Sequence, residues 1–410
     1  RNRPVIRPRY HSMVWSHTLI SFSYETILRV SILINFICFG LVNGQNYNVL
    51  KFGAKGDGQT DDSEAFTQAW NATCGGEDNI NTLLIPSGKT YLLQPIEFKG
   101  PCKSTSIKIQ LDGIIVAPSN IKAWSSPKSQ MWIGFSSVFS LMIDGSGKID
   151  GRGSSFWEAL HINKCDNLTI NGITSIDSPK THISIKGCNY ATISKINILA
   201  PEKSPNTDGI DISYSTNIKI SDSTIQTGDD CIAIDNGSSG INITQINCGP
   251  GHGISVGSLG ADGTNAEVSE VHVTHCTFNE TMNGARIKTW QGGQGYARNI
   301  SFENITLINT RNPIIIDQQY IDKGHIDATR DSAVAIGNVK YIGFRGTTVN
   351  EYAITLNCSA ITHCKDVVMD DIEVTMENGE KAKVECQNVE GESSDSDLMR
   401  DCFKTNSTSY

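Results

Sequence analysis

The chain has 410 residues, of which 37 are glycine and 12 are proline, and aromatic residues make up 7% of it. This length is enough for a large hydrophobic core in one domain or in two. A net charge of −9 at pH 7 excludes nucleic acid as an expected partner, because domains that bind nucleic acid are usually basic. The same field repels other polyanions, so a site for an acidic sugar would need local cations.

The first 44 residues have the pattern of a leader. An apolar run at residues 30–42 follows Arg29 and ends in Val42-Asn43-Gly44. This run is too short for a membrane span, which needs about 20 apolar residues, but it suits the hydrophobic region of a signal peptide. We therefore expect a secreted protein that begins at residue 45 and has no membrane segment after cleavage. Residues 1–12 precede Met13 and are a candidate for untranslated sequence, and an uncleaved anchor is the alternative.

Helical periodicity is nearly confined to residues 61–70, DDSEAFTQAW, where Asp61 and Glu64 have the spacing of a capping box. The rest of the chain shows short strands of alternating Ile and Val between Gly, Asn, Asp and Ser. Three of these strands repeat at a spacing of 22 residues, and the pattern recurs with longer spacers. The three copies are Asp208 with Ile210 and Ile212, Asp230 with Ile232 and Ile234, and His252 with Ile254 and Val256; the recurrences are at Ile183/Ile185, Ile287, Ile315, Ile354 and Val384.

A repeat of this length with one apolar strand in each copy indicates a solenoid. Because the repeats are short and lack helices, we expect an all-β, right-handed parallel β-helix with a short N-terminal capping helix, over residues 45–378. An antiparallel sandwich or propeller is the alternative, but it explains the register less well because hairpins reverse direction. Residues 379–410 are polar and are expected to form a C-terminal tail. Solenoids with capped ends are usually monomers, so we expect a monomer.

Twelve cysteines are present, and Cys38 lies inside the leader. Secretion permits disulfides, and at least one of the eleven remaining thiols must stay free. Nine N-x-S/T sequons are candidates for glycosylation. The favoured bridges are Cys231–Cys248, Cys358–Cys364 and Cys386–Cys402, with Cys74–Cys102 possible; the sequons are at Asn71, Asn167, Asn236, Asn242, Asn279, Asn299, Asn304, Asn357 and Asn406.

The repeat predicts that Asp208, Asp230 and His252 stack in a column on three successive coils, with Asp229 beside Asp230. Asp is common in turns because its side chain bonds nearby backbone N–H groups. Three carboxylates on adjacent coils repel one another, however, and a turn does not require that. Repulsion raises at least one pKa, so one carboxylic acid can stay protonated as a general acid while the other two hold and deprotonate a water.

Two cations are expected beside these carboxylates. Arg286 and Lys288 flank an inward-pointing Ile287, so strand alternation places both on the outer face. Adjacent cations in an acidic protein favour an anionic substrate. Residues 253–257, GISVG, match the nucleophile-elbow pattern G-x-S-x-G, but no helix is expected after the Ser, so a serine nucleophile is not predicted.

Four motifs together resemble the plant polygalacturonases, which are pectin-degrading glycoside hydrolases. The resemblance runs from about residue 47 to residue 377 and includes residues 48–62, NVLKFGAKGDGQTDD. The combination in this order is far more specific than any one motif. The motifs are SPNTDGIDIS at 204–213, TGDDCIAI at 227–234, GPGHGISVGSLG at 249–260 and ARIKTWQGGQGYAR at 285–298.

The resemblance implies a right-handed parallel β-helix and hydrolysis of α-1,4-linked galacturonate with inversion. By motif, Asp229 would protonate the glycosidic oxygen, and Asp208 and Asp230 would activate the attacking water. His252 would tune the acid. The implied partner is the pectin or polygalacturonate polysaccharide, and no metal or organic cofactor is implied.

The resemblance also assigns binding residues. Arg286 and Lys288 would grip the galacturonate carboxylate, and Tyr320 resembles a tyrosine of the family that contacts the substrate. Three alternatives stay open: hydrolysis of rhamnogalacturonan or xylogalacturonan, a Ca²⁺-dependent pectate lyase, and an inactive pectin-binding wall protein. The acid pair argues against the lyase, which needs a basic residue as its base, and the complete set of Asp and His argues against the inactive protein.

Overall fold

The computed structural model describes residues 44–119, 131–153, 158–321, 331–394, 399, 402 and 403. The apolar run of the expected leader, Cys38 and the sequon at Asn406 lie outside these residues. No helix among the described residues is long and apolar enough to cross a membrane.

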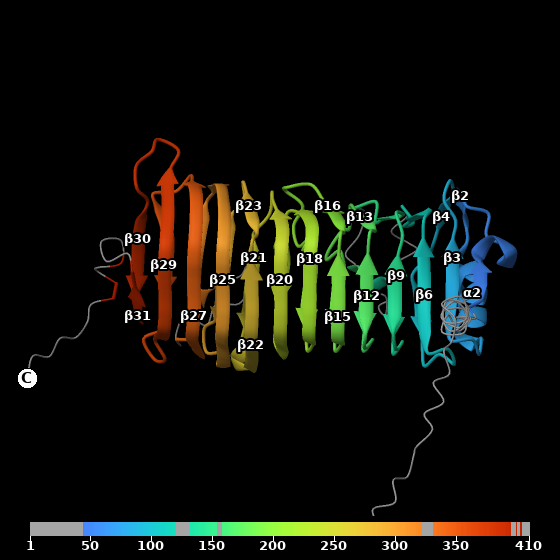
Figure 1. Ribbon diagram of the computed structural model, residues 1–410, viewed down its shortest axis with the longest axis horizontal. Helices are drawn as coiled ribbons and strands as arrows, with labels where there is room; N and C mark the ends of the chain where they lie inside the picture. The colour runs from blue at the N-terminus through green and yellow to red at the C-terminus, as the bar shows by residue number, and fades with distance from the viewer. Residues whose placement is uncertain are drawn as a thin grey trace, which may run out of the picture. The chain divides into compact units, whose positions relative to one another are not determined.

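The described strands pair in parallel and follow one another along the stack in chain order (Figure 1), so the expected parallel β-helix is confirmed and the antiparallel alternative is wrong.

The strands of the described segments form an 11-stranded sheet and a 20-stranded sheet. The 11-stranded sheet contains β5 (Ile96–Lys99), β8 (Met131–Ser136), β11 (Glu158–Asn163), β14 (Ile183–Lys186), β17 (Ile210–Ser213), β19 (Ile232–Ile234), β21 (Ile254–Leu259), β24 (Asn283–Trp290), β26 (Asn312–Tyr320), β28 (Tyr352–Asn357) and β30 (Lys383–Gln387). The 20-stranded sheet contains β1 (Asn46–Asn48), β2 (Asp57–Asp61), β3 (Ile80–Ile85), β4 (Thr90–Leu92), β6 (Ser106–Leu111), β7 (Ile114–Val116), β9 (Leu141–Asp144), β10 (Lys148–Asp150), β12 (Leu168–Asn171), β13 (Thr174–Ile176), β15 (Asn189–Ser194), β16 (Asn197–Leu199), β18 (Thr216–Gln226), β20 (Ser238–Cys248), β22 (Asn265–Thr274), β23 (Thr277–Asn279), β25 (Gln294–Thr310), β27 (Ala333–Thr348), β29 (Cys364–Met376) and β31 (Val389–Ser393).

The 22-residue repeat corresponds to two in-register coils. Ile210 of β17 pairs with Ile232 of β19, which pairs with Ile254 of β21, and all three side chains are fully buried. The solenoid interior is a continuous column of such aliphatic side chains, which the burial of apolar area stabilises.

The prediction that Ile315 occupies the buried position of the repeat is wrong. Ile315 pairs with Arg286 and is half-buried, whereas its neighbours Ile314 and Ile316 are fully buried. Because side chains alternate between the two faces of a strand, a slip of one residue exchanges the inner and outer positions. The run of three isoleucines hid this alternation.

The capping helix is α2 (Ser63–Gly75), which packs on the first coils. Its buried Trp70 lies 5.2 Å from the ring of Phe98. The expected capping box does not form, because the helix begins at Ser63 with Asp62 as its N-cap. The Asp62 carboxylate instead accepts hydrogen bonds from the backbone of residues 55 and 56. Two short 3₁₀ turns, η1 (Val49–Phe52) and η3 (Ala261–Gly263), are also present among the described residues.

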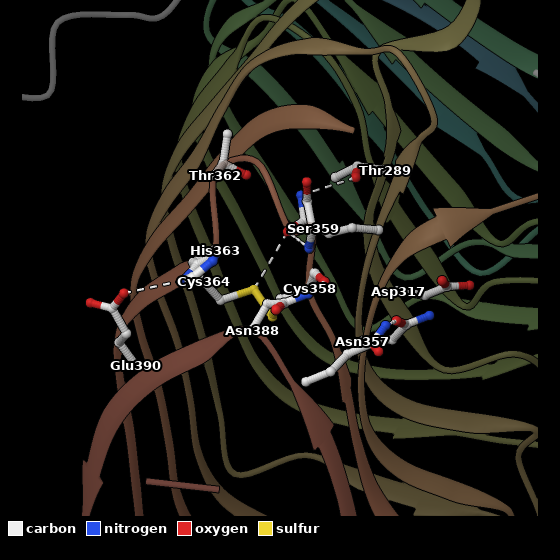
Figure 2. The surroundings of a disulfide bond; sticks show 12 residues. Thr289, Asp317, Asn357, Cys358, Ser359, Thr362, His363, Cys364, Asn388 and Glu390 are labelled. Carbon is white, nitrogen blue, oxygen red and sulfur yellow. Dashed lines mark hydrogen bonds and ion pairs between the residues drawn. A yellow bond between two sulfur atoms is a disulfide. The ribbon is translucent and has the colours of Figure 1, made fainter. Parts of the chain in front are cut away.

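All four expected disulfides are present, and three buried cysteines of the described chain, at positions 165, 188 and 276, stay free. The Cys358–Cys364 bridge closes the turn that leads from β28 to β29, as Figure 2 shows. The backbone N–H of Ser359 in this turn donates to the buried side chain of Gln318 on the preceding coil. The bridge therefore fixes a turn between the two sheets, which is typical of a disulfide that restricts the unfolded chain.

The parallel pairing continues into the segment expected to be a tail. β30 pairs with β28, and β31 pairs with β29. The Cys386–Cys402 disulfide ties this last coil to residue 402. The sheets thus extend past the boundary expected at residue 378.

One glycine is required by the close approach of two coils. Gly228 lies directly before Asp229, and a Cβ atom at this position would meet the Ser204 carbonyl oxygen at 2.0 Å. Such a contact is too short to exist, so the turn must shift if a side chain is added. The absence of a side chain at residue 228 therefore helps to place residues 229 and 230.

We predict that Gly228→Ala lowers the free energy of unfolding by about 1–3 kcal/mol, because the turn is overpacked. Gly75→Ala is the matched control, since a Cβ there meets nothing within 4 Å. Chemical denaturation of both variants measures the difference. Equal stability of the two variants would contradict the close approach.

Candidate active site

The strands β17, β19 and β21 carry the expected column. Each strand begins two residues after Asp208, Asp230 or His252, so these three side chains lie on adjacent coils. Backbone bonds hold the turns together, since the N–H of Gly209 donates to the Asp230 carbonyl at 2.9 Å. The disulfide from Cys231 to residue 248 fixes the same turn directly after Asp230. The structure thus brings together the three residues that the repeat aligned.

Asp230 is the most enclosed of the carboxylates, with 1% of its surface exposed. One oxygen accepts hydrogen bonds from the Ser255 hydroxyl at 2.9 Å and from the Arg286 guanidinium at 2.6 Å. The other accepts from the Lys288 ammonium at 3.0 Å. A buried charge is tolerable only when it is paired and hydrogen-bonded, and two cations meet this need.

Asp229 forms a second, separate pair with His252. The Nδ1 atom of His252 lies 2.9 Å from Asp229 Oδ1, and that oxygen also accepts the N–H of Asp230 at 2.9 Å. Burial raises the pKa of Asp229, but the hydrogen bond and charge of His252, together with the charge of Lys288, outweigh it and hold the pKa below its usual range. Asp229 is therefore an ionised carboxylate when no substrate is bound.

Asp208 has the opposite electrostatics. Burial is the largest cause, and the negative charges of Asp211, Asp229 and Asp230 add to it, so the pKa of Asp208 lies well above its usual range. Lys288 lowers this pKa only in part. The unliganded site therefore favours a proton on Asp208, whereas the resemblance assigns the role of the protonated acid to Asp229, whose pKa is lowered.

A cavity of about 570 Å³ opens along the outer face of the 11-stranded sheet, and Asp208, Asp230 and Lys288 line it. The ammonium group of Lys288 lies 5.3 Å from the centre of the Tyr320 ring. That ring meets Trp290 edge-on at 5.0 Å. Tyr320 is therefore brought beside the cations, one coil farther along the stack.

Asp229, Asp230 and His252 are a group among the described residues that could hold a metal ion, since their ligand atoms lie within 4.8 Å of one another. Both oxygens of Asp230 already face the cations Arg286 and Lys288. These positive charges oppose a divalent cation at the same place. The donor set therefore fits an organic substrate better than it fits a metal.

The sequence of residues 74–396 matches the family model of glycosyl hydrolases family 28. The chain belongs to this family. It is 49% identical to a probable polygalacturonase of Arabidopsis thaliana over 84% of the chain and 78% of that protein, and 41% identical to polygalacturonase-2 of Solanum lycopersicum over 83% and 78%. The fold resembles endo-xylogalacturonan hydrolase of Aspergillus tubingensis, with a TM-score of 0.72 and 28% identity over 85% of the chain and 96% of that structure.

This member of family 28 is a glycoside hydrolase, and its site includes groups that sequence reasoning missed. Ser255 is fully buried and bridges Asp230 to the Nε atom of Arg286, which donates to its hydroxyl at 2.8 Å. Asp211 and Asp235 line the cavity beside Asp208. The 22-residue repeat could have indicated Asp211 and Ser255, because residues 211, 233 and 255 occupy the same outward position on successive strands. The G-x-S-x-G pattern points to Ser255 only as a nucleophile and does not indicate its place between Asp230 and Arg286.

The carboxyl group of Asp211 lies in an environment that disfavours its negative charge. Its Oδ2 accepts a hydrogen bond from the Thr181 hydroxyl at 2.6 Å, while its Oδ1 is buried without a partner among the described residues. Burial raises the pKa of Asp211 to about 7, and the nearby charges of Glu158, Asp230 and Asp235 contribute. The hydrogen bond from Thr181 offsets only part of this rise.

Folding therefore binds a proton at Asp211 between pH 4 and pH 7, and this carboxyl group lowers stability as the pH rises through that window. We predict that Asp211→Asn removes this loss, which is at most about 4 kcal/mol at pH 7. The unfolding free energy of the variant minus that of the parent should be more positive at pH 7 than at pH 4. A difference that does not change with pH would contradict the raised pKa.

Proposed function

We propose that the protein is a polygalacturonase that hydrolyses α-1,4-galacturonosyl linkages of de-esterified pectin. The observation that carries the proposal is the juxtaposition of three carboxylates and one imidazole with two cations, in a group of which Asp208, Asp230 and Lys288 line the first cavity. Carboxyl groups supply the acid and base of glycoside hydrolysis. The cations supply the local positive charge that an acidic sugar needs in a protein of net charge −9. Two curated relatives carry the name polygalacturonase.

In the proposed reaction Asp229 donates a proton to the glycosidic oxygen as the bond to the anomeric carbon breaks. Asp208 and Asp230 hold the attacking water, and Asp208 takes its proton, because its raised pKa makes it the stronger base. The active state needs Asp229 protonated and Asp208 ionised, the reverse of the order in the unliganded site. A galacturonate carboxylate bound to Lys288 offsets the positive charge that lowers the pKa of Asp229, so binding raises that pKa toward the value that an acid needs. Asp208 must give up its proton before it can accept one from the water.

The proposed binding roles follow from the same contacts. Arg286 has five N–H donors and uses two of them, on Asp230 and Ser255, so others remain for a substrate carboxylate. Lys288 has three donors and uses one on Asp230. Tyr320 offers its ring to the sugar beside Lys288. His252 holds Asp229 in place and adjusts its proton affinity.

We further propose that the protein is secreted and acts as a monomer on pectin of the cell wall. Four disulfides support an oxidising compartment. The sequon asparagines at 71, 167, 242, 279 and 304 are exposed and therefore accessible to glycosylation. The expected leader at residues 1–44 supports the same route.

A second candidate substrate is xylogalacturonan. The observation that favours it is the similarity, above 25% identity, to a xylogalacturonan hydrolase structure. Its backbone offers the same galacturonate carboxylates to Arg286 and Lys288, so the cations do not separate the two substrates. Rates on polygalacturonate and on xylogalacturonan at equal mass concentration separate them directly.

We predict that the purified protein releases reducing ends from polygalacturonate at mildly acidic pH with a chelator present. Asp229→Asn should lower the rate about 10²- to 10⁴-fold, the range of a general acid contribution. Asp222→Asn, on the exposed surface, is the matched control and should keep the parent rate. No release by the folded parent would contradict the proposal, and release only without chelator would favour a lyase that needs Ca²⁺.

The same variants test which carboxyl group is the acid. An aryl α-galacturonide has a leaving group that departs with little protonation, so Asp229→Asn should lose far less activity on it than on polygalacturonate. Asp208→Asn, which removes the base, should lose activity on both substrates. The reverse result would make Asp208 the acid.

A further inference from the structure

A second cavity of about 420 Å³ begins at His252 and is not used by the proposed chemistry. Its wall includes Met282, Asn309, Arg311 and Val349. Met282, Arg311 and Val349 lie in turns, and Asn309 lies near the end of β25. All four belong to coils that follow the catalytic turn, because the N–H of Met282 donates to the Gly251 carbonyl at 2.7 Å and the N–H of Arg311 donates to the Thr281 carbonyl at 2.9 Å. The second cavity therefore continues along the solenoid axis from the catalytic residues.

The two cavities are lined by different members of the reacting group. Asp208, Asp230 and Lys288 line the first cavity, whereas His252 lines the second and contacts Asp229. A polysaccharide that crosses Asp229 from the first cavity enters the second. Each coil adds about 4.8 Å along this path, so the turn that carries Arg311 lies one coil beyond the turn of Met282.

Arg311 is a cation without an assigned partner. Its side chain is exposed, and its guanidinium makes no ion pair or hydrogen bond with any other residue that the structure describes. In Asn309, the Oδ1 atom accepts from the Thr347 hydroxyl at 2.9 Å, and this hydroxyl in turn accepts the N–H of Asn309. The Nδ2 donors of Asn309 have no partner among the described residues, so two unused donor groups line one cavity.

We propose that Arg311 and Asn309 bind the carboxylate of a second galacturonosyl residue, on the His252 side of the cleaved bond. A guanidinium offers a planar fork of N–H donors that matches a carboxylate. Met282 and Val349, both more than 40% exposed, give apolar surface for the C–H face of the sugar ring. This inference rests on the proposed function and narrows the substrate to runs of adjacent unesterified residues.

Two acidic residues of the second cavity allow a variant with the opposite expected effect on substrate affinity. Glu202 and Glu280 line the same cavity and are exposed, and neither forms an ion pair with Arg311. Their charge opposes a substrate carboxylate without occupying the guanidinium. Removal of Arg311 and removal of a glutamate should therefore shift affinity for de-esterified substrate in opposite directions.

The experiment measures binding of a galacturonate hexamer to the full chain carrying Asp229→Asn, so that cleavage does not interfere. Adding Arg311→Gln should raise Kd about 5- to 20-fold, since a hydrogen-bonded charge is lost, and Glu280→Gln should lower Kd. Both effects should shrink at high salt, because the charges are exposed to solvent. Arg345→Gln, an exposed arginine on β27 that pairs with Asp371, is the matched control and should leave Kd unchanged.

Esterified substrate separates carboxylate recognition from a general loss of binding. For a hexamer with every carboxyl group methylated, Arg311→Gln should leave Kd where it was. An unchanged Kd for the free hexamer, or an equal loss for both hexamers, would overturn the assignment of Arg311. If the parent background binds the free hexamer no better than it binds a neutral galactose hexamer, the proposed function fails as well.

Discussion

The in-register parallel stacking of the 11-stranded sheet is the constraint on which the rest of this structure depends. Two successive coils have the same 22-residue length, so Asp208, Asp230 and His252 occupy one position on three adjacent turns. One residue added to either coil would turn the strand over and exchange its inner and outer faces. The buried isoleucines that hold the stack together therefore also set the places of the reacting groups.

Stacking of the coils brings three carboxyl groups close together, and each of them has different neighbouring charges. Asp230 is neutralised by Arg286 and Lys288, and Asp229 is held ionised by His252. Asp208 has no such partner among the residues that the structure describes, and its pKa rises. The pKa values of Asp208 and Asp229, on adjacent coils, are thus shifted in opposite directions, which is the division of roles that acid–base chemistry requires.

Much of the fold could be predicted from the sequence because its signals are local or periodic. Equal spacers revealed the coil, and short loops revealed the disulfides, including Cys358–Cys364. The predictions were wrong where the sequence does not show the alternation of a strand, or where a side chain contacts a residue that sequence spacing does not indicate. Ile315 lies in a run of isoleucines without alternation. The helix begins after Asp62 and not after Asp61, and the carboxylate of Asp62 binds the backbone of a turn that sequence spacing does not show. The site was foreseen as a column, but the bridge through Ser255 depends on which outward side chains meet, which alternation alone does not specify.

The stereochemistry of the product tests the central claim most directly. The ligand atoms of Asp229, Asp230 and His252 lie within 4.8 Å of one another, whereas inverting carboxyl pairs are usually about 6.5–9.5 Å apart. Both oxygens of Asp230 are held by cations, however, so we expect water rather than this carboxylate to attack. Proton NMR during the first turnovers of a galacturonate oligomer should show the β-anomer of the new reducing end first. The α-anomer first would mean a covalent intermediate on a carboxylate, and it would contradict the account.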